Sequence, residues 1–508
     1  METARLEKMG WRLVPRNGIL AAGGLSLVIV SETTLDRRMR QVVHGNLPRT
    51  YALPRTALAV CQEAFLGSVT LAGLRLNDGL VLLGQHCFFG TGVRGLTLPA
   101  SVREVAEGAF AECGRLKYAD LSAARGLRAL GKAAFDQCRE LGRLLLNEGL
   151  ETVRTEACSC LAVEEVVFPR TLRHIESTAF AGCRGLRRVR FAGDALESIG
   201  SFAFLRSGLE AFVAPASLHK VGECAFAGCA ALRRADLGPC MRDRRSNARV
   251  FLCKGAFRES GVEEVLLPRA LGTICEETFC ACRALRSVVF VDGSALEEVQ
   301  RMAFHGSGLR SFAVPRSLRR IGDMAFGDCR ALRELRLEPG VQLGWFCFWR
   351  TALPAAMLPT HTPERLGLQA DPRVLALPDG LAEVGENWFA GCEIETLAVS
   401  SSVRTLKWCA FADCKRLREV VFEPESGLQR IENGCFRYCA LRRLVLPKSV
   451  QSIGDFAFDG CRALSALSFE DGSQLKSVGE RAFHDTQLRP ETVRYPRTLR
   501  ASRHGKEW

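Results

Sequence analysis

The chain has 508 residues, of which 47% are hydrophobic and 25% are charged, a composition that excludes a disordered or low-complexity polypeptide. Its formal net charge is +13, which is compatible with a polyanion-binding face but does not require one. No stretch reaches the roughly 18 apolar residues of a membrane-spanning helix, and 22 Cys residues are too few for a disulfide-rich scaffold of this length.

The first 46 residues precede the regular part of the sequence and are expected to cap its N-terminal end. Their most apolar stretch, residues 18–30, follows two Arg residues and could be interpreted as a signal peptide. It lacks a small-x-small cleavage site, however, and begins late. We therefore favour a β-strand at residues 25–30.

From residue 47 to residue 496 the chain repeats one unit, usually every 22 to 25 residues. Each unit, here called a rung, contains an Ala-Phe pair and a Cys, Ser or Thr three residues after the Phe, as in Ala179-Phe180 with Cys183. We call this Phe the plug, because it is expected to fill the interior of its rung. A fixed period of this length predicts a solenoid in which each rung packs on its neighbours. Plugs are expected at positions 65, 88, 110, 135, 180, 204, 226, 257, 279, 304, 326, 348, 389, 411, 436, 458 and 483, with Cys158 in place of one.

Each rung also carries an L-x-x-L-x-L segment, which predicts a strand. In residues 332–337, Leu335 and Leu337 point inward and Glu334 outward, by the two-residue period of a strand. Stacked in register, these segments predict one long parallel sheet of about 19 strands. The opposite side carries Ile-Gly-x-x-Ala-Phe, where we expect short helical or 3₁₀ turns and a Gly at positive φ. The expected fold class is α/β.

Two steps of the repeat are longer than the others. Between the plugs at 226 and 257 the excess, residues 238–247, is expected to form a projecting basic loop. Between 348 and 389 the 41 residues divide as 22 plus 19, which indicates a degenerate rung at residues 360–378 without its plug. Residues 497–508 are expected to form a basic tail.

The position three residues after the plug, here called the slot, holds ten of the 22 Cys residues. A position that accepts Cys, Ser and Thr alike indicates a small, weakly polar side chain in a tight interior. Because slot residues of neighbouring rungs point the same way, we expect free, buried thiols, which favour a reducing compartment. The Cys residues in the slot are Cys113, Cys138, Cys183, Cys229, Cys282, Cys329, Cys392, Cys414, Cys439 and Cys461.

The full unit, L-x-x-L-x-L-P-x-x-L-x-x-I-G-x-x-A-F-x-x-C, occurs at residues 309–329 and 441–461. It resembles the leucine-rich repeats of BspA type, also called the Treponema pallidum type. The resemblance covers most of the chain and implies a leucine-rich-repeat solenoid, curved as a horseshoe or arc, that binds proteins or acts as an adhesin without being an enzyme. It also implies a cell-surface location, whereas the lack of a clear signal peptide and the free thiols favour the cytoplasm, so the location stays open.

No motif in the sequence predicts catalysis, a cofactor or a metal. Residues 90–95 match G-x-G-x-x-G, but they precede a strand instead of following one, which is the wrong order for a dinucleotide site. The C-x-C pairs at 158–160 and 280–282 are weak metal signals, since no paired His accompanies them. We therefore predict no catalytic, cofactor-binding or metal-binding residues.

The outward residue between the last two inward positions of each L-x-x-L-x-L strand is a better functional lead. From residue 266 to 445 these residues are apolar except for one Arg, and a long exposed apolar strip is typical of an interaction site. The alternative is that β-branched residues simply favour strands. The predicted partner-binding residues are Leu266, Val289, Ala313, Arg336, Met357, Ala376, Ala398, Val421 and Val445.

The sequence thus predicts the function only at the level of class. We expect a monomeric, non-enzymatic scaffold that binds a protein ligand through this strip. The alternative is binding of nucleic acid or another polyanion through Arg-rich rows, which we consider the weaker hypothesis because few aromatic residues are available for stacking. The residues of that alternative are Arg242, Arg244, Arg245 and Arg249.

Overall fold

The structure is a computed structural model of the chain. It describes residues 49–238, 250–352 and 373–489 except 54, 56, 61, 336, 338–340 and 378, the backbone of three short strands before residue 28, and residues 493, 495, 496 and 499. The chain divides into two compact units, Met1–Val262 and Glu263–Trp508. In both units the rungs that the structure describes each contribute two short strands, so each unit is a stack of rungs with two strand-bearing sides.

The first unit begins with three antiparallel strands, β1, β2 and β3. β3 confirms the predicted strand for residues 25–27, while residues 28–30 lie outside the described part. These strands are β1 (Leu13–Arg16), β2 (Ile19–Ala22) and β3 (Leu25–Leu27).

In the first unit, one strand of each rung comes from the L-x-L end of the repeat and the other precedes the plug. We call them L-x-L strands and second strands. The L-x-L strands are β4 (Thr50–Ala52), β6 (Gly73–Arg75), β8 (Gly95–Thr97), β10 (Tyr118–Asp120), β12 (Arg143–Leu145), β14 (Glu165–Phe168), β16 (Arg188–Phe191), β18 (Ala211–Val213) and β20 (Arg234–Asp236). The second strands are β5 (Ala59–Val60), β7 (Leu82–Leu83), β9 (Glu104–Val105), β11 (Ala129–Leu130), β13 (Thr152–Val153), β15 (His174–Ile175), β17 (Ser198–Ile199), β19 (Lys220–Val221) and β21 (Val250–Leu252).

The second unit repeats the same plan. Its L-x-L strands are β22 (Glu264–Leu267), β24 (Ser287–Phe290), β26 (Ser311–Phe312), β28 (Glu334–Leu335), β30 (Val374–Ala376), β32 (Thr396–Val399), β34 (Glu419–Phe422), β36 (Arg443–Leu446) and β38 (Ala466–Phe469). Its second strands are β23 (Leu271–Ile274), β25 (Glu298–Val299), β27 (Arg320–Ile321), β29 (Gln342–Leu343), β31 (Glu383–Val384), β33 (Thr405–Leu406), β35 (Arg430–Ile431), β37 (Ser452–Ile453) and β39 (Ser477–Val478).

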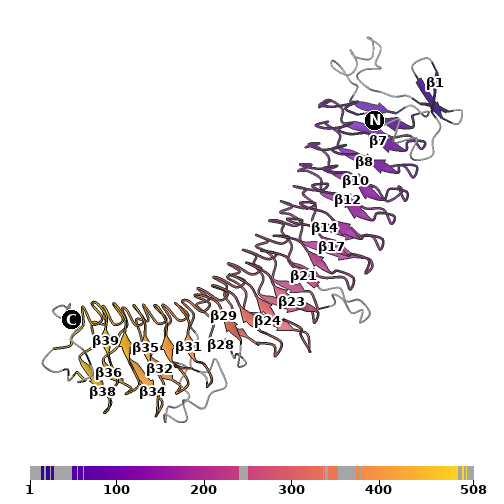
Figure 1. Ribbon diagram of the computed structural model, residues 1–508. Helices are drawn as coiled ribbons and strands as arrows, with labels where there is room; N and C mark the ends of the chain where they lie inside the picture. Colours follow the sequence, from indigo (N-terminus) through magenta and orange to yellow (C-terminus); the bar gives the residue numbers. More distant parts are fainter. Residues whose placement is uncertain are drawn as a thin grey trace. The chain divides into compact units, whose positions relative to one another are not determined.

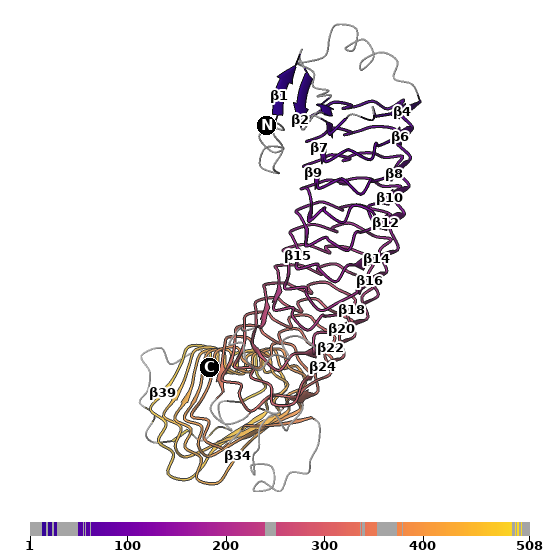
Figure 2. The same cartoon turned by 90° about the vertical axis from the view of Figure 1, so that its right-hand side faces the viewer.

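The parallel solenoid is confirmed, but the expectation of one long sheet from the L-x-L strands is wrong. In the first unit the second strands form the continuous ladder, from β5 to β21, whereas the L-x-L strands pair in groups of two or three (Figures 1 and 2). In the second unit the second strands pair from β23 to β29 and from β31 to β39. The second strands therefore pair without interruption across more consecutive rungs than the L-x-L strands do.

The plugs form the core of both units. Their rings stack face to face on those of the neighbouring rungs, with centroids between 4.9 Å (Phe65 to Phe88) and 6.1 Å (Phe348 to Phe389). The stack runs through both irregular steps, because Phe226 stacks on Phe257 and Phe348 on Phe389. Residues 239–249 and 353–372, which hold most of the predicted basic loop and part of the predicted degenerate rung, lie outside the described residues.

The turn segment around each plug is not helical. No α-helix or 3₁₀ segment occurs among the residues that the structure describes, so the expected helical turns are not found and the described part is all β and turn. Instead, backbone N–H groups of alternate residues bond to the next rung, as from Glu63 to the Gln85 carbonyl at 2.9 Å and from Phe65 to the Cys87 carbonyl at 2.8 Å. Residues two before and two after the plug adopt positive φ, for example Glu63 (57°) and Gln137 (58°). The hydrogen bonds to the next rung offset the strain of these left-handed conformations.

The Gly of the Ile-Gly pair has a different role from the one expected. Gly200, Gly222 and Gly454 are not among the positive-φ residues, so that expectation is wrong. A Cβ on Gly222 would lie 2.5 Å from the backbone carbon of Gly200, and one on Gly454 would lie 2.5 Å from the backbone nitrogen of Asn433. These positions require Gly because the backbones of consecutive rungs approach too closely for a side chain.

Each slot Cys is buried and makes a specific contact. The Sγ of Cys229 donates to the carbonyl of Phe204, the preceding plug, at 3.0 Å, and Cys329 does the same to Phe304 at 3.0 Å. Where the slot holds Ser207 or Ser307, the hydroxyl contacts the Cys of the next slot, Cys229 or Cys329, at 3.3 Å in both cases. The slot thus needs a small donor, which explains why Cys, Ser and Thr alternate there. All twenty cysteines of the described residues are free thiols.

Alkaline pH is expected to destabilise the solenoid through these thiols. Burial raises the pKa of Cys229 to about 11 and that of Cys329 to about 12. Above the pKa of about 8.5 of an exposed thiol, the unfolded chain loses protons that the folded chain keeps, so the free energy of unfolding falls by about 1.4 kcal/mol per pH unit for each such thiol. Urea unfolding at pH 7.5, 9 and 10 should show a falling midpoint. The loss should be smaller in Cys229→Ser/Cys329→Ser, and a midpoint independent of pH would contradict the thiol origin.

Candidate functional site

The predicted partner-binding residues of the second unit differ in exposure. Val289 and Val445, on β24 and β36, are 43% and 51% exposed, and Ala313 is also exposed. Leu266 and Val421 are half-buried. Ala376 and Ala398 are buried and pack with Val374, so the strip is not continuously exposed there. Arg336 and Met357 lie outside the described residues.

The corresponding outward row of the first unit also exposes apolar side chains. Leu145, Val167 and Val213 lie at the outward position of β12, β14 and β18 and are 37%, 53% and 60% exposed. Leu145 and Val167 line one groove with a cavity volume of about 450 Å³. Their consecutive places in the outward row were the sequence signal for this groove, but charged neighbours in the same row obscured it.

The edge of this groove is mainly acidic. Glu148, Glu164 and Glu165 line it, whereas Arg143 is the cation among its lining residues in the described part. Ser122, also in the lining, donates its hydroxyl to Asp120 Oδ1 at 2.6 Å. This hydrogen bond lowers the pKa of Asp120, so Asp120 stays a carboxylate beside the groove.

Many surface Arg and Lys side chains are paired with acids on a neighbouring rung. In the first unit Arg128 lies 3.0 Å from Glu151, and in the second Lys407 lies 2.7 Å from Glu383. Such exposed pairs contribute little to stability, but they neutralise charge that a polyanion would need. Arg242, Arg244, Arg245 and Arg249 of the alternative hypothesis lie outside the described residues.

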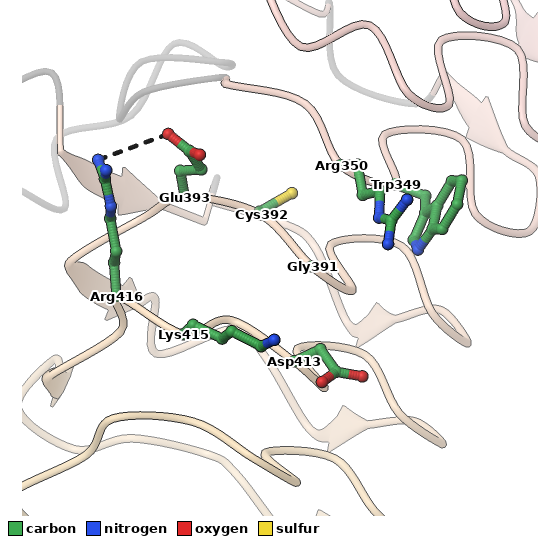
Figure 3. A pocket seen from close by; sticks show the side chains of 8 residues that line it. All are labelled: Trp349, Arg350, Gly391, Cys392, Glu393, Asp413, Lys415 and Arg416. Carbon is green, nitrogen blue, oxygen red and sulfur yellow. Dashed lines mark ion pairs between the residues drawn. The ribbon is translucent and has the colours of Figure 1, made fainter.

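A second groove lies on the turn side of the second unit (Figure 3). Its cavity volume is about 360 Å³, and its lining includes Trp349, Arg350, Asp413, Lys415 and Arg416. The Arg350 guanidinium lies 4.5 Å from the centre of the Trp349 ring. Arg416 forms an ion pair with Glu393 at 3.5 Å, and Figure 3 shows Lys415 extending toward Asp413. The groove therefore combines an aromatic ring with charges of both signs.

Within the part of the chain that the structure describes, no three His, Cys, Asp or Glu residues are grouped so that they could hold a metal ion. The same residues include no helix long and apolar enough to cross a membrane.

The repeat motif and the stacked plugs can be compared with known families. The family described as BspA type Leucine rich repeat region (6 copies) matches residues 58–187, 156–248, 251–364 and 382–502, which is most of the chain. The chain belongs to this family. BspA-type leucine-rich repeats build solenoids that are generally scaffolds for protein interaction and are typically not enzymes.

Three solved structures illustrate the likeness of this BspA-type chain to bacterial proteins. A leucine-rich repeat protein from Bacteroides ovatus is 17% identical, with 94% of this chain and 90% of that chain covered and a TM-score of 0.48. A leucine-rich cell surface protein from Faecalibacterium prausnitzii is 16% identical, with 90% and 95% covered and a TM-score of 0.36. The pneumococcal vaccine antigen PcpA is 14% identical, with 80% and 82% covered and a TM-score of 0.32. Among curated proteins no sequence matches the chain.

Proposed function

We propose that this BspA-type solenoid is a protein-binding scaffold that holds its partner against the outward residues of the L-x-L strands. The observation that carries the proposal is the row of exposed Leu145, Val167 and Val213 in the first unit, two of which line one groove. Leu145 and Val167 lie on neighbouring rungs, and exposed apolar side chains fixed on a rigid solenoid provide contact area at little entropic cost. In the second unit, Val289 and Val445 supply further contacts of the same kind.

The chemistry of the groove indicates which surface of a partner would fit. Its apolar floor favours aliphatic or aromatic side chains, and the carboxylates of Glu148 and Glu164 favour Lys or Arg beside them, whereas Glu165 already pairs with Arg190 at 2.7 Å. A partner segment that alternates apolar and basic residues satisfies both requirements. The paired surface cations of the described rungs make this occupant a better match than a polyanion.

The proposal predicts that a carboxylate placed on the groove floor weakens partner binding. Leu145→Asp and Val167→Asp should each weaken capture of the partner at least about tenfold, because each buries an unpaired charge in the contact. The full chain is immobilised and incubated with extract of its source cells, and the captured protein is identified and then titrated in purified form. Both variants should keep the circular dichroism spectrum of the unchanged protein, because the two side chains are exposed.

A matched control is Val69→Asp, which introduces the same charge at a valine that is 64% exposed on the turn side of the same unit. It should bind the partner as the unchanged protein does. Equal loss of binding in Val69→Asp and Val167→Asp would contradict the assignment of the groove. Binding that survives in both groove variants but disappears between low and moderate salt would instead support the polyanion alternative.

A further inference from the structure

Four of the six Trp residues of the chain lie in three consecutive rungs on the turn side of the second unit. Trp345 and Trp349 belong to the rung of plug Phe348, Trp388 to that of Phe389, and Trp408 to that of Phe411. The rings of these plugs stack in this order, with centroids 6.1 Å and 5.4 Å apart. The four indoles are thus brought onto one side of one unit.

Folding does not require aromatic residues at these places. Trp345 and Trp408 both stand three residues before their plugs, a position that other rungs fill with polar residues such as Glu107, Ser201 and Arg301. Those rungs form the same turn segments, so an exposed indole adds nothing that the solenoid needs. Trp345 is 61% and Trp408 is 48% exposed, which costs free energy in water unless a ligand covers the rings.

The two exposed indoles are held in register. The carbonyl of Trp345 accepts the N–H of Met324 at 2.8 Å, and the carbonyl of Trp408 accepts that of Asn387 at 3.0 Å, so both occupy the same place in the rung-to-rung ladder. One rung separates them, which sets their backbones about 10 Å apart at about 4.8 Å per rung. Glu386 occupies the same position in the rung between them.

The charges around the indoles compensate each other. Arg330 pairs with Asp328 at 2.9 Å, and Lys407 pairs with Glu383 at 2.7 Å. In the adjoining groove Arg416 pairs with Glu393, and Arg350 stacks over Trp349 (Figure 3). The backbone N–H groups of Trp345 and Trp408 also donate to the carboxylates of Asp323 (2.8 Å) and Glu432 (3.2 Å), so a polyanion would meet at least as many carboxylates as cations on this side. A neutral ligand rich in hydroxyl groups fits the balance, because both members of each pair can bond to hydroxyls.

We propose that the turn side of the second unit is a binding site for a neutral polysaccharide. The C–H faces of two sugar rings pack on Trp345 and Trp408, and the intervening Glu386 and the charged groups of the adjoining groove bond to ring hydroxyls. The repeating spacing of the rungs matches a ligand that is itself a repeat. This site is independent of the L-x-L face and of the protein partner proposed for it.

The test uses the full chain and a panel of soluble neutral polysaccharides, namely β-1,3-glucan, hydroxyethyl-β-1,4-glucan, mannan and starch. Affinity electrophoresis through gels containing each polymer should show retardation by at least one of them. Trp345→Ala and Trp408→Ala should each weaken that binding about tenfold, the size of effect that removal of one stacking ring produces, and the double variant should abolish it. The binding should be insensitive to salt between 50 and 300 mM.

Tyr118→Ala is the control, because Tyr118 is an exposed ring (48%) on the L-x-L side of the first unit. It and Leu145→Asp should bind the polysaccharide as the unchanged protein does. Failure of every polymer to retard the protein would overturn the proposal, as would equal retardation of the double Trp variant. Retention by a single-stranded oligonucleotide with none by the neutral polymers would assign the rings to a polyanion and overturn it too.

Discussion

Replacement of Phe226 by Ala is expected to lower the free energy of unfolding of the first unit by about 3–5 kcal/mol. The Phe226 side chain is completely buried, and its ring lies between those of Phe204 (5.4 Å) and Phe257 (5.1 Å), with Phe212 at 4.7 Å. Ala leaves a cavity that the two adjacent rungs cannot close, because both are fixed by their own strands and plugs. Urea unfolding followed by circular dichroism measures the loss.

The matched control is Phe251→Ala. Phe251 lies on β21 of the same unit and is 52% exposed, so the same deletion should cost less than about 1 kcal/mol. If both variants lose the same free energy, the stability of the unit does not reside in the plug stack. Because each rung contacts only its neighbours, native-state hydrogen exchange should place the loss in the rungs adjacent to Phe226.

The plug stack could be predicted from the sequence because its signal repeats at every rung. A Phe recurs every 22 to 25 residues, usually preceded by Ala and followed by a small slot residue. This pattern predicts one ring stacked in each rung. The structure confirms it even across the long step from Phe348 to Phe389. A periodic signal tolerates exceptions. One rung that departs from the pattern, such as the rung with Cys158 in place of a plug, does not obscure the period that the other rungs share.

The backbone of the turn segments could not be predicted in the same way. Positive φ falls on residues as different as Glu112, Thr178, Met302 and Tyr438, so residue identity carries no consistent signal for it. The conformation arises from hydrogen bonds between rungs, which are long-range in sequence. The expectation of helical turns considered only one rung at a time, and so it missed the partner that the next rung supplies.

The exposure of the outward residues of the L-x-L strands also could not be predicted from the sequence. Period-two alternation places Ala376 and Ala398 outward by the same rule as Val445, yet both are buried and Val445 is exposed. Alternation states which face a side chain takes but not whether something else covers that face. The groove at Leu145 and Val167 and the indoles at Trp345 and Trp408 became candidates only when exposure could be compared among equivalent positions of many rungs.

Replacement of Gly454 by Ala is expected to destabilise the second unit by about 1–3 kcal/mol or more, although it adds a single methyl group. Its Cβ would lie 2.5 Å from the backbone nitrogen of Asn433 and 2.7 Å from the backbone carbon of Glu432. Neither atom can move aside as a side chain would, because the N–H of Gly454 itself bonds to the carbonyl of Ile431 at 2.8 Å. The methyl group therefore forces adjacent rungs apart along the ladder from β35 to β37.

Gly272→Ala separates this steric effect from the general effect of replacing Gly. A Cβ on Gly272, in β23 of the same unit, meets no atom within 4 Å, and Gly272 is not among the positive-φ residues. This variant should be neutral or slightly stabilising, since Ala restricts the unfolded chain more than Gly does. The midpoints of urea unfolding of the two variants should be compared, and we expect a lower midpoint for Gly454→Ala than for Gly272→Ala. Equal midpoints would mean that the close approach of Gly454 to the preceding rung carries no steric cost, and the requirement for Gly at this position would then lose its explanation.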